Sequence, residues 1–166
     1  MGSKRIGLAR IQALIENLKR EINLGSSTLS FARLPTTAKT ADFTAEAGNC
    51  YLITKLDGCD VTLPAISEIG DQIKLVFGAV TSNAHTVTCD ATTTLFQGYA
   101  LLEDTADGTA AKHVVFAPDE SDDDAMSLNG TTTGNSGIIT LTATATNRWF
   151  VEARLTASGN VATPFA

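Results

Sequence analysis

Few residues of this chain have the types and the spacing that catalysis or metal binding requires. His85 and His113 are the only histidines, and neither stands at a spacing typical of metal ligands or of a catalytic nucleophile. The sequence contains no GxSxG, HExxH, GxxxxGKS/T or GxGxxG motif. We therefore expect both histidines to be polar residues of strands or loops, and we expect no enzyme activity and no cofactor.

Acidic side chains are the next candidates for chemistry. The segment from Asp119 to Asp124 holds five carboxylates and one serine, which supply enough oxygen atoms for a hard cation. It lacks the glycine and the bidentate glutamate of an EF-hand loop, so a solvated acidic loop is favoured and a calcium site is the alternative.

A glycosidase would need two acids about 5 to 10 Å apart in a cleft, usually edged by aromatic rings. The single tryptophan gives that interpretation little support.

The cysteines do not form a recognisable framework. Cys50, Cys59 and Cys89 are an odd number and show no CxxC spacing, so neither a set of disulfides nor a thiolate zinc site is supported. We expect buried, reduced thiols and no metal. A bridge between Cys50 and Cys59 on adjacent strands is the alternative if the mature protein spends its life outside the cell.

Length and composition exclude several classes of protein. The 166 residues, 43% of them hydrophobic, are enough for one domain with its own core. No apolar run approaches the roughly 20 residues of a membrane-spanning helix, and residues 1–10 lack the hydrophobic stretch of a secretory signal. The formal net charge of -6 disfavours general attraction to DNA or to anionic lipid. We expect no nucleic-acid partner and no membrane partner.

The charge is unevenly distributed along the chain. Residues 1–24 carry five basic and two acidic side chains, a balance of +3, which leaves -9 for the remainder. A solvated helix face explains the basic residues, and docking of Lys4, Arg5 and Arg10 on an acidic partner is the alternative.

Residues 1–25 are expected to form one α-helix, with Ser3 as its N-cap and Gly25 after its end. Its apolar positions follow the three-four spacing of a heptad seam: Leu8, Ile11, Ile15, Leu18 and Ile22. Such a helix would be about 30 Å long, but two heptads are too few for a stable isolated coiled coil. The seam therefore packs either on the rest of its own chain or on other copies.

Two segments without a regular period are expected to reach a neighbouring subunit. Residues 26–41 form an extended arm whose apolar anchors include Phe31 and Leu34, and a loop of that length is uncommon inside a compact domain. The C-terminal tail, residues 161–166, carries Phe165. We expect these three large side chains to lie at interfaces between subunits.

Residues 42–166 read as a β domain, because short β-favouring runs alternate with turn signals. The expected strands are 50–55, 60–63, 72–77, 86–89, 94–99, 112–117, 125–129, 137–145 and 148–155. The turn dipeptide Asp57-Gly58 predicts a hairpin of the first two strands. The absence of a βαβ pattern disfavours a parallel α/β enzyme fold. The expected fold is mainly β, an antiparallel sandwich or barrel of tulip-like or jelly-roll-like form.

The clearest alternation is in the last two runs. Ile139, Leu141 and Ala143 fall on one side of the first run, and threonines fall on the other. In the second run Trp149, Val151, Ala153 and Leu155 alternate with Phe150, Glu152, Arg154 and Thr156. One face of this hairpin is expected to be core, and the threonine-rich face is expected to meet either water or the same face of a partner.

Four parts of the sequence carry a resemblance to a known class of proteins. They are Tyr51–Thr54 to Val61–Pro64, Leu101–Thr109, Asn129–Gly134, and Trp149–Glu152 to Ala162–Ala166. Together they resemble virion structural proteins of tailed bacteriophages, particularly of marine and cyanobacterial phages. Proteins of this size and composition in such phages are usually capsid decoration (cement) proteins or fibre-like appendages, so the resemblance implies a structural role and no active site.

The function expected from these observations is that of a capsid decoration protein. It would form a homotrimer, bind the major capsid protein on the outside of a phage head, and be found on the virion after assembly in the host cytoplasm. A tail or head fibre module is the alternative, and a polysaccharide-degrading enzyme domain is the third. A fibre should show repeats or a longer heptad run, and an enzyme should show a constellation of histidines or acids.

Overall fold

The computed structural model describes residues 12, 34–78, 83–105 and 112–166. A boundary after Arg33 divides the chain into two units, and the β body is the unit that begins at Leu34. The helix expected over residues 1–25 and the arm up to residue 33 fall outside the described residues, apart from Gln12. Among the described residues, no helix is long and apolar enough to cross a membrane.

The described body is mainly β. Its strands are β1 (Thr36–Lys39), β2 (Phe43–Thr44), β3 (Asn49–Ile53), β4 (Asp60–Thr62), β5 (Gln72–Phe77), β6 (His85–Thr88), β7 (Leu95–Asp104), β8 (Lys112–Phe116), β9 (Ala125–Leu128), β10 (Ser136–Ala145) and β11 (Arg148–Ala157). Strands β3 to β11 confirm the nine runs expected from the sequence. The short strands β1 and β2 were not expected, and β1 corrects the end of the supposed arm, which is paired with β3.

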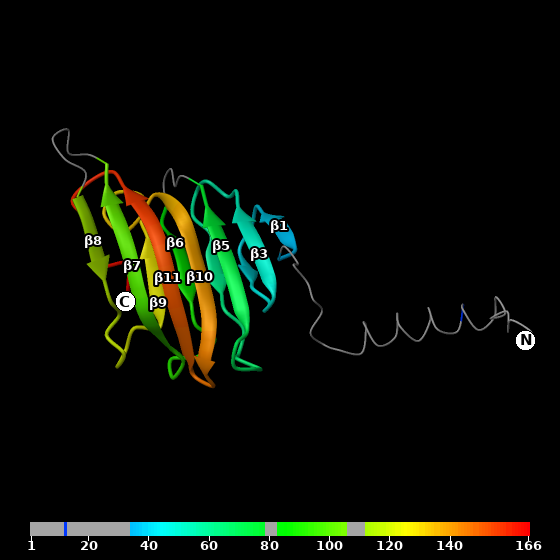
Figure 1. Ribbon diagram of the computed structural model, residues 1–166. Helices are drawn as coiled ribbons and strands as arrows, with labels where there is room; N and C mark the ends of the chain where they lie inside the picture. Colours follow the sequence, from blue (N-terminus) through cyan, green and yellow to red (C-terminus); the bar gives the residue numbers. More distant parts are fainter. Residues whose placement is uncertain (1–11, 13–33, 79–82, 106–111) are drawn as a thin grey trace, which may run out of the picture. The chain divides into compact units, whose positions relative to one another are not determined.

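The strands form two sheets around one core. The larger sheet has the order β1-β3-β5-β10-β11-β7-β8 and the smaller has the order β2-β4-β6-β9. Figure 1 shows β6 and β9 of the smaller sheet behind the larger one. Buried side chains of both sheets belong to one hydrophobic cluster, which includes Ile73, Leu141 and Val151 from the larger sheet and Val87 and Met126 from the smaller.

The first six strands alternate between the two sheets. β1, β3 and β5 pair in parallel in the larger sheet, and β2, β4 and β6 pair in parallel in the smaller. The expected hairpin at Asp57-Gly58 is therefore wrong, since that turn carries the chain from β3 in one sheet to β4 in the other. The crossing places Tyr51 of β3 and Val61 of β4 in the same core from two different sheets.

The expectation of antiparallel sheets is also wrong. Five of the nine strand pairings are parallel, and four are antiparallel. Parallel neighbours need a long crossover connection, which is usually a helix. In this body the other sheet supplies the crossover, so the absence of a βαβ pattern did not exclude parallel pairing.

The hairpin of β10 and β11 is confirmed and lies in the middle of the larger sheet. Trp149, Val151, Ala153 and Leu155 are buried as their alternation predicted. The side chains between them on β11 are turned to the opposite face of the sheet and are at least partly exposed. This hairpin therefore supplies both the centre of the core and the centre of the solvent-facing surface.

The C-terminal tail packs on its own chain, which contradicts the interface expected at Phe165. The Phe165 side chain is 6% exposed, and its ring lies 6.3 Å from that of Phe96 between centroids. The Ser127 and Ala125 backbone N–H groups donate to the carbonyls of Pro164 and Ala166. The tail thereby covers the open edge of β9. An uncovered edge strand presents unpaired backbone groups that another chain can bind.

Candidate functional site

The candidate site is the face of the seven-stranded sheet that is turned away from the core, which we call the outer face. The strand register places one side chain of each strand in a single line across it. This line, called the apolar row, consists of Ala38, Leu52, Val76, Ile138, Arg154, Leu101 and Val115, in the order β1-β3-β5-β10-β11-β7-β8. Six of these seven residues are apolar.

The apolar row is exposed at several of its large side chains. Leu52 is 39% exposed, Ile138 is 41% exposed and Val115 is 62% exposed. Single exposed apolar residues are ordinary, whereas a contiguous exposed patch marks a surface that binds another molecule. Burying one such side chain stabilises a complex by about 1.5 to 3 kcal/mol at full burial, so the row offers substantial binding energy.

A second line of side chains runs beside the apolar row. This line, called the polar row, consists of Thr36, Cys50, Lys74, Thr140, Glu152 and Tyr99, in the order β1-β3-β5-β10-β11-β7. Each of these residues precedes a residue of the apolar row by two positions on its own strand, except on the antiparallel strand β10, where Thr140 follows Ile138 by two. The two rows thus lie about 7 Å apart on the sheet surface.

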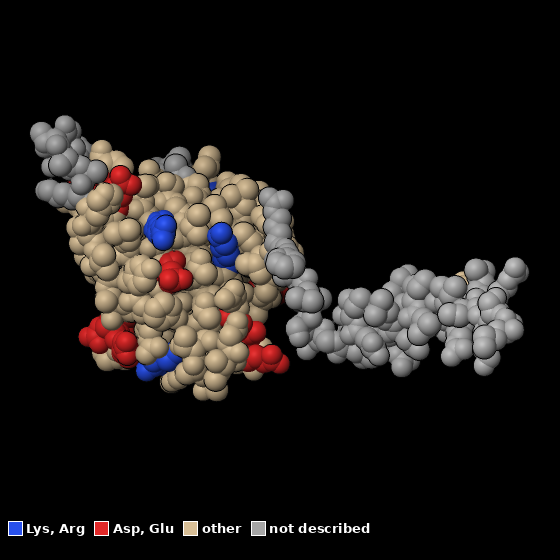
Figure 2. Space-filling view, in the orientation of Figure 1, with Lys and Arg blue, Asp and Glu red and all other residues tan. Residues whose placement is uncertain are grey.

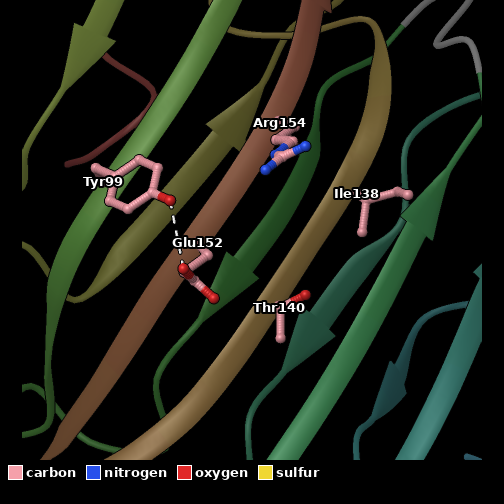
Figure 3. Close-up of a pocket in the computed structure, with 5 residues that line it drawn as sticks. All are labelled: Tyr99, Ile138, Thr140, Glu152 and Arg154. Carbon is pink, nitrogen blue, oxygen red and sulfur yellow. Dashed lines mark hydrogen bonds between the residues drawn. The ribbon is translucent and has the colours of Figure 1, made fainter.

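A shallow hollow of about 260 Å³ lies between the rows and is lined by Tyr99, Ile138, Thr140, Glu152 and Arg154. Figure 3 shows Tyr99 on β7, Glu152 and Arg154 on β11, and the other two on β10. The Tyr99 hydroxyl donates a hydrogen bond of 3.3 Å to Glu152 Oε1. This bond fixes the carboxylate at the centre of the outer face.

A second hollow of about 200 Å³ continues the first toward β8. It is lined by Leu101, Glu103, His113, Arg154, Leu155 and Thr156. Arg154 lines both hollows, so the two adjoin at this residue. The two hollows therefore form one depression along β7 and β11.

The outer face has little charge, and Figure 2 shows only a few Lys, Arg, Asp or Glu side chains in its middle. In the described part of the chain, the only ion pair joins Lys55 Nζ to Asp42 Oδ1 at 2.7 Å. The hydrogen bond from Lys55 holds the pKa of Asp42 below its ordinary value. Arg154 thus carries a charge without a carboxylate partner among those residues.

This combination of side chains suits the binding of a protein surface. Tyrosine and arginine are the residues most enriched at the energetic centres of protein interfaces, and Tyr99 and Arg154 here border exposed apolar side chains. The hollows are shallow and open along the sheet, whereas small-molecule sites bury most of their ligand in a deep cleft. No group of three or more His, Cys, Asp or Glu within the described ranges is placed to hold a metal ion.

The two histidines have different surroundings. His113 is exposed on β8 at the second hollow. His85 begins β6 as a strand residue, but it is only 1% exposed and neither ring nitrogen has a hydrogen-bond partner in the described structure. The expectation of a polar strand histidine thus holds for the position of His85 and fails for its burial.

The acidic segment from Asp119 to Asp124 is a loop in which the Asp119 carboxylate accepts bonds from the Ser121 N–H and hydroxyl. The three cysteines are buried, as expected, and in this structure they are free, with no bridge between Cys50 and Cys59.

The residues expected at interfaces are only partly within the structure. Leu34 is half-buried just before β1, and Phe165 lies in the core. The remainder fall outside the described residues: Leu8, Ile11, Ile15, Leu18, Ile22 and Phe31 for subunit contacts, and Lys4, Arg5 and Arg10 for capsid docking. Their assignments stay predictions.

Sequence reasoning did not select Tyr99, Glu152 and Arg154 as site residues. The alternation of β11 placed Glu152 and Arg154 opposite Trp149, which was a usable signal. Tyr99 could not be added from the sequence, because it reaches Glu152 only through the parallel pairing of β7 with β11. Neither the models of known protein families nor the curated proteins give a match to this chain.

Proposed function

We propose that this protein is a structural protein of a tailed-phage virion, which decorates the outside of the head and stabilises the shell. The observation that carries this proposal is the apolar row across the outer face, because an exposed apolar surface that crosses seven strands favours assembly with other proteins. The resemblance of four parts of the sequence to phage virion proteins supports a phage virion as the assembly that this protein joins.

The proposed partners are the major capsid protein and other copies of this chain, as a homotrimer. The seam from Leu8 to Ile22 supports the trimer, and the basic residues Lys4, Arg5 and Arg10 support docking on an acidic shell. Weak contacts that repeat over a lattice add up through multivalency, so no single contact needs to be strong. The proposed location is the capsid surface, after assembly in the host cytoplasm.

The finer architecture that we propose for the body is an open β-sandwich. Both sheets contribute to one core, and within the described strands no pairing joins one sheet to the other. A closed barrel would need such pairings. The parallel coil of β1 to β6 distinguishes this body from a jelly roll, which consists of antiparallel strands.

The second candidate, a fibre module, is favoured by that same parallel coil. β1 with β2, β3 with β4, and β5 with β6 form three successive turns that stack in parallel. Stacked turns of this kind build elongated solenoids, in which each turn contacts its neighbours. The antiparallel strands β9 and β10 end the coil in both sheets, which favours the compact decoration protein over the fibre.

The proposal is tested by adding purified protein to phage heads that lack it and measuring the bound copies by sedimentation. We expect Ile138→Asp to lower the affinity about tenfold or more, since about 1.4 kcal/mol gives a factor of ten. Ile69→Asp is the matched control, because Ile69 is 71% exposed and lies outside both rows. Equal binding of both variants and of the wild type would remove the outer face from the proposal.

The basic residues give an independent arm of the same experiment. Replacing Lys4, Arg5 and Arg10 together by Ala should reduce occupancy, and raised salt should reduce the wild-type occupancy toward the same level. Salt acts this way because exposed charges are screened within about 8 Å at physiological ionic strength. Binding that ignores both changes would reject docking by these residues.

A further inference from the structure

We propose that the outer face binds the same face of a second copy of this chain around a two-fold axis, with Arg154 of each copy paired to Glu152 of the other. This inference rests on the proposed function, because it names the occupant of the assembly surface. Two-fold contacts between bodies would link neighbouring decoration proteins across a shell.

The geometry follows from the two rows. The proposed two-fold axis lies in the plane of contact. It runs perpendicular to the strands, parallel to the two rows and midway between them, so the rotation exchanges the positions of the apolar row and the polar row. The apolar row of one copy then faces the polar row of the other, strand by strand. Such a contact is isologous, so every pair of residues occurs twice.

On β11 this arrangement pairs charges. Arg154 faces Glu152 of the partner subunit, and Glu152 faces Arg154 of the partner subunit. Arg154 has no ion pair among the described residues, and Glu152 accepts only the Tyr99 hydroxyl there. Both charges would therefore gain a partner when the contact excludes water, which is the condition under which charged groups are tolerated in an interface.

On the neighbouring strands the arrangement pairs apolar groups. On β7 the Leu101 side chain faces the ring of Tyr99 of the partner subunit, and on β10 the Ile138 side chain faces the methyl group of Thr140 of the partner subunit. Tyrosine supplies a large contact area at low entropic cost. The hollow beside Tyr99 leaves room for a side chain of the facing copy.

The size of the outer face is sufficient for such a contact. The seven strands have between four and ten residues each. At about 3.3 Å per residue and about 4.8 Å between strands, they cover roughly 800 Å². Stable interfaces bury about 800 Å² per partner, so nearly the whole face would take part.

The charge pattern selects a second copy over an unrelated partner. On β11 the face carries one acidic and one basic side chain two residues apart, at 152 and 154, and the basic side chain of Lys74 lies in the polar row two strands away, on β5. The charged pair on β11 is complementary to itself after the two-fold rotation, and Lys74 faces the apolar Val76 of the partner subunit. A uniformly acidic or basic partner would leave one of the two charges opposite a like charge, which costs binding free energy.

Charge reversal in the full-length chain tests the proposal by sedimentation velocity over a range of concentrations. In the wild type, β bodies should associate two by two through their outer faces, whether each body belongs to a single chain or to a trimer. Glu152→Arg alone and Arg154→Glu alone should each weaken the association at least tenfold. An equimolar mixture of these two variants should associate as the wild type does, because each copy then offers the charges that the other lacks.

The double variant Glu152→Arg with Arg154→Glu should also recover the wild-type association, since it swaps the two charges within each copy. Thr144→Arg is a control for added charge on an exposed position of the same face outside both rows, and it should weaken the association less than either reversal. Melting temperatures that match the wild type show that the variants fold.

Three outcomes would overturn the inference: a wild type without pairing at the highest concentration, single reversals that associate like the wild type, or a mixture that associates no better than its parts. If a different protein occupies the face, one reversal weakens binding to heads and mixing does not restore it. Heads that take up the wild type normally while the mixture fails would reject the two-fold contact and leave the proposed function standing.

Discussion

The imidazole of His85 lies against the phenyl ring of Phe77, with 5.1 Å between the ring centroids. The two residues belong to successive strands in different sheets, so this contact joins the sheets within the core. Burial lowers the pKa of His85 below its ordinary value of 6.5, and the charge of Lys55 lowers it further. The folded protein therefore holds His85 as a neutral, aromatic core residue.

We expect the stability of the protein to fall as the pH drops below about 6.5. The unfolded chain takes up a proton at His85 near that pH, whereas the folded chain takes it up only at a lower pH. Stability from this residue is thus complete above 6.5 and is lost below it, with a slope of at most about 1.4 kcal/mol per pH unit. Urea unfolding of the wild type and of His85→Phe at pH 7.5 and pH 5 measures the difference.

The control for this prediction is His113→Phe, which changes the exposed histidine. His85→Phe should lose part of the pH dependence, and His113→Phe should keep the wild-type dependence. If His85→Phe and the wild type lose the same stability between the two pH values, His85 is not the group responsible.

Phe165 should stabilise the folded chain itself. Truncation of a buried phenylalanine to alanine typically costs 3 to 5 kcal/mol, and Phe165 is packed beside Phe96 in the core. We expect Phe165→Ala to lower the free energy of unfolding by about 3 kcal/mol in chemical denaturation. Ile69→Ala removes exposed side-chain atoms and should stay within about 0.5 kcal/mol of the wild type. A loss seen only in oligomer mass would restore Phe165 to a subunit interface.

Gly98 is expected to be intolerant of any side chain. Its φ of +104° lies in the region that favours glycine, and an added Cβ would collide with the backbone of Val151 on the neighbouring strand. Gly98→Ala should therefore cost about 2 to 4 kcal/mol of stability. Gly78→Ala is the matched control, since its Cβ would meet only the Ile53 carbonyl at 3.8 Å. Equal melting temperatures for the two variants would contradict the close approach of β7 and β11.

The thiol of Cys89 should resist alkylation until the protein unfolds. Burial raises its pKa to about 12, and the carboxylates of Asp124 and Asp90 contribute to the rise. Because the thiolate is the reactive form, and three pKa units separate 12 from the ordinary value of 9.0, alkylation should be slower by roughly a thousandfold. Mass spectrometry after iodoacetamide treatment should find Cys89 labelled only in denaturant. Rapid labelling at neutral pH in the native protein would show that Cys89 is accessible.

The strands were predictable, whereas their partners were not, apart from the hairpin of β10 and β11. Alternation identified β10 and β11 because burial on one face imposes a period of two, and Trp149 and Val151 are buried accordingly. The pairing of β3 with β5, and of β7 with β11, depends on contacts between residues far apart in the sequence. A local sequence pattern does not determine such contacts. The parallel coil of β1 to β6 and the apolar row were therefore both missed.

The expected assignments for single residues failed where packing decided the outcome. Phe165 was placed at an interface because its segment has no regular period, but its bridge to Met126 and its packing beside Phe96 place it in the core. Asp57-Gly58 has the composition of a hairpin turn, but β3 pairs with β1 and β5 in one sheet and β4 pairs with β2 and β6 in the other. Glu152 and Arg154 were correctly expected on the face opposite Trp149, and only the register showed what surrounds them.

The proposed cement function is tested most directly by comparing phage particles assembled with and without this protein. The comparison uses density maps of the virion and the temperature at which heads release their DNA. We predict density for the protein on the outside of the head, and a higher release temperature for particles that contain it. Equal release temperatures would contradict the cement function, and density on the tail would assign the protein to a fibre instead.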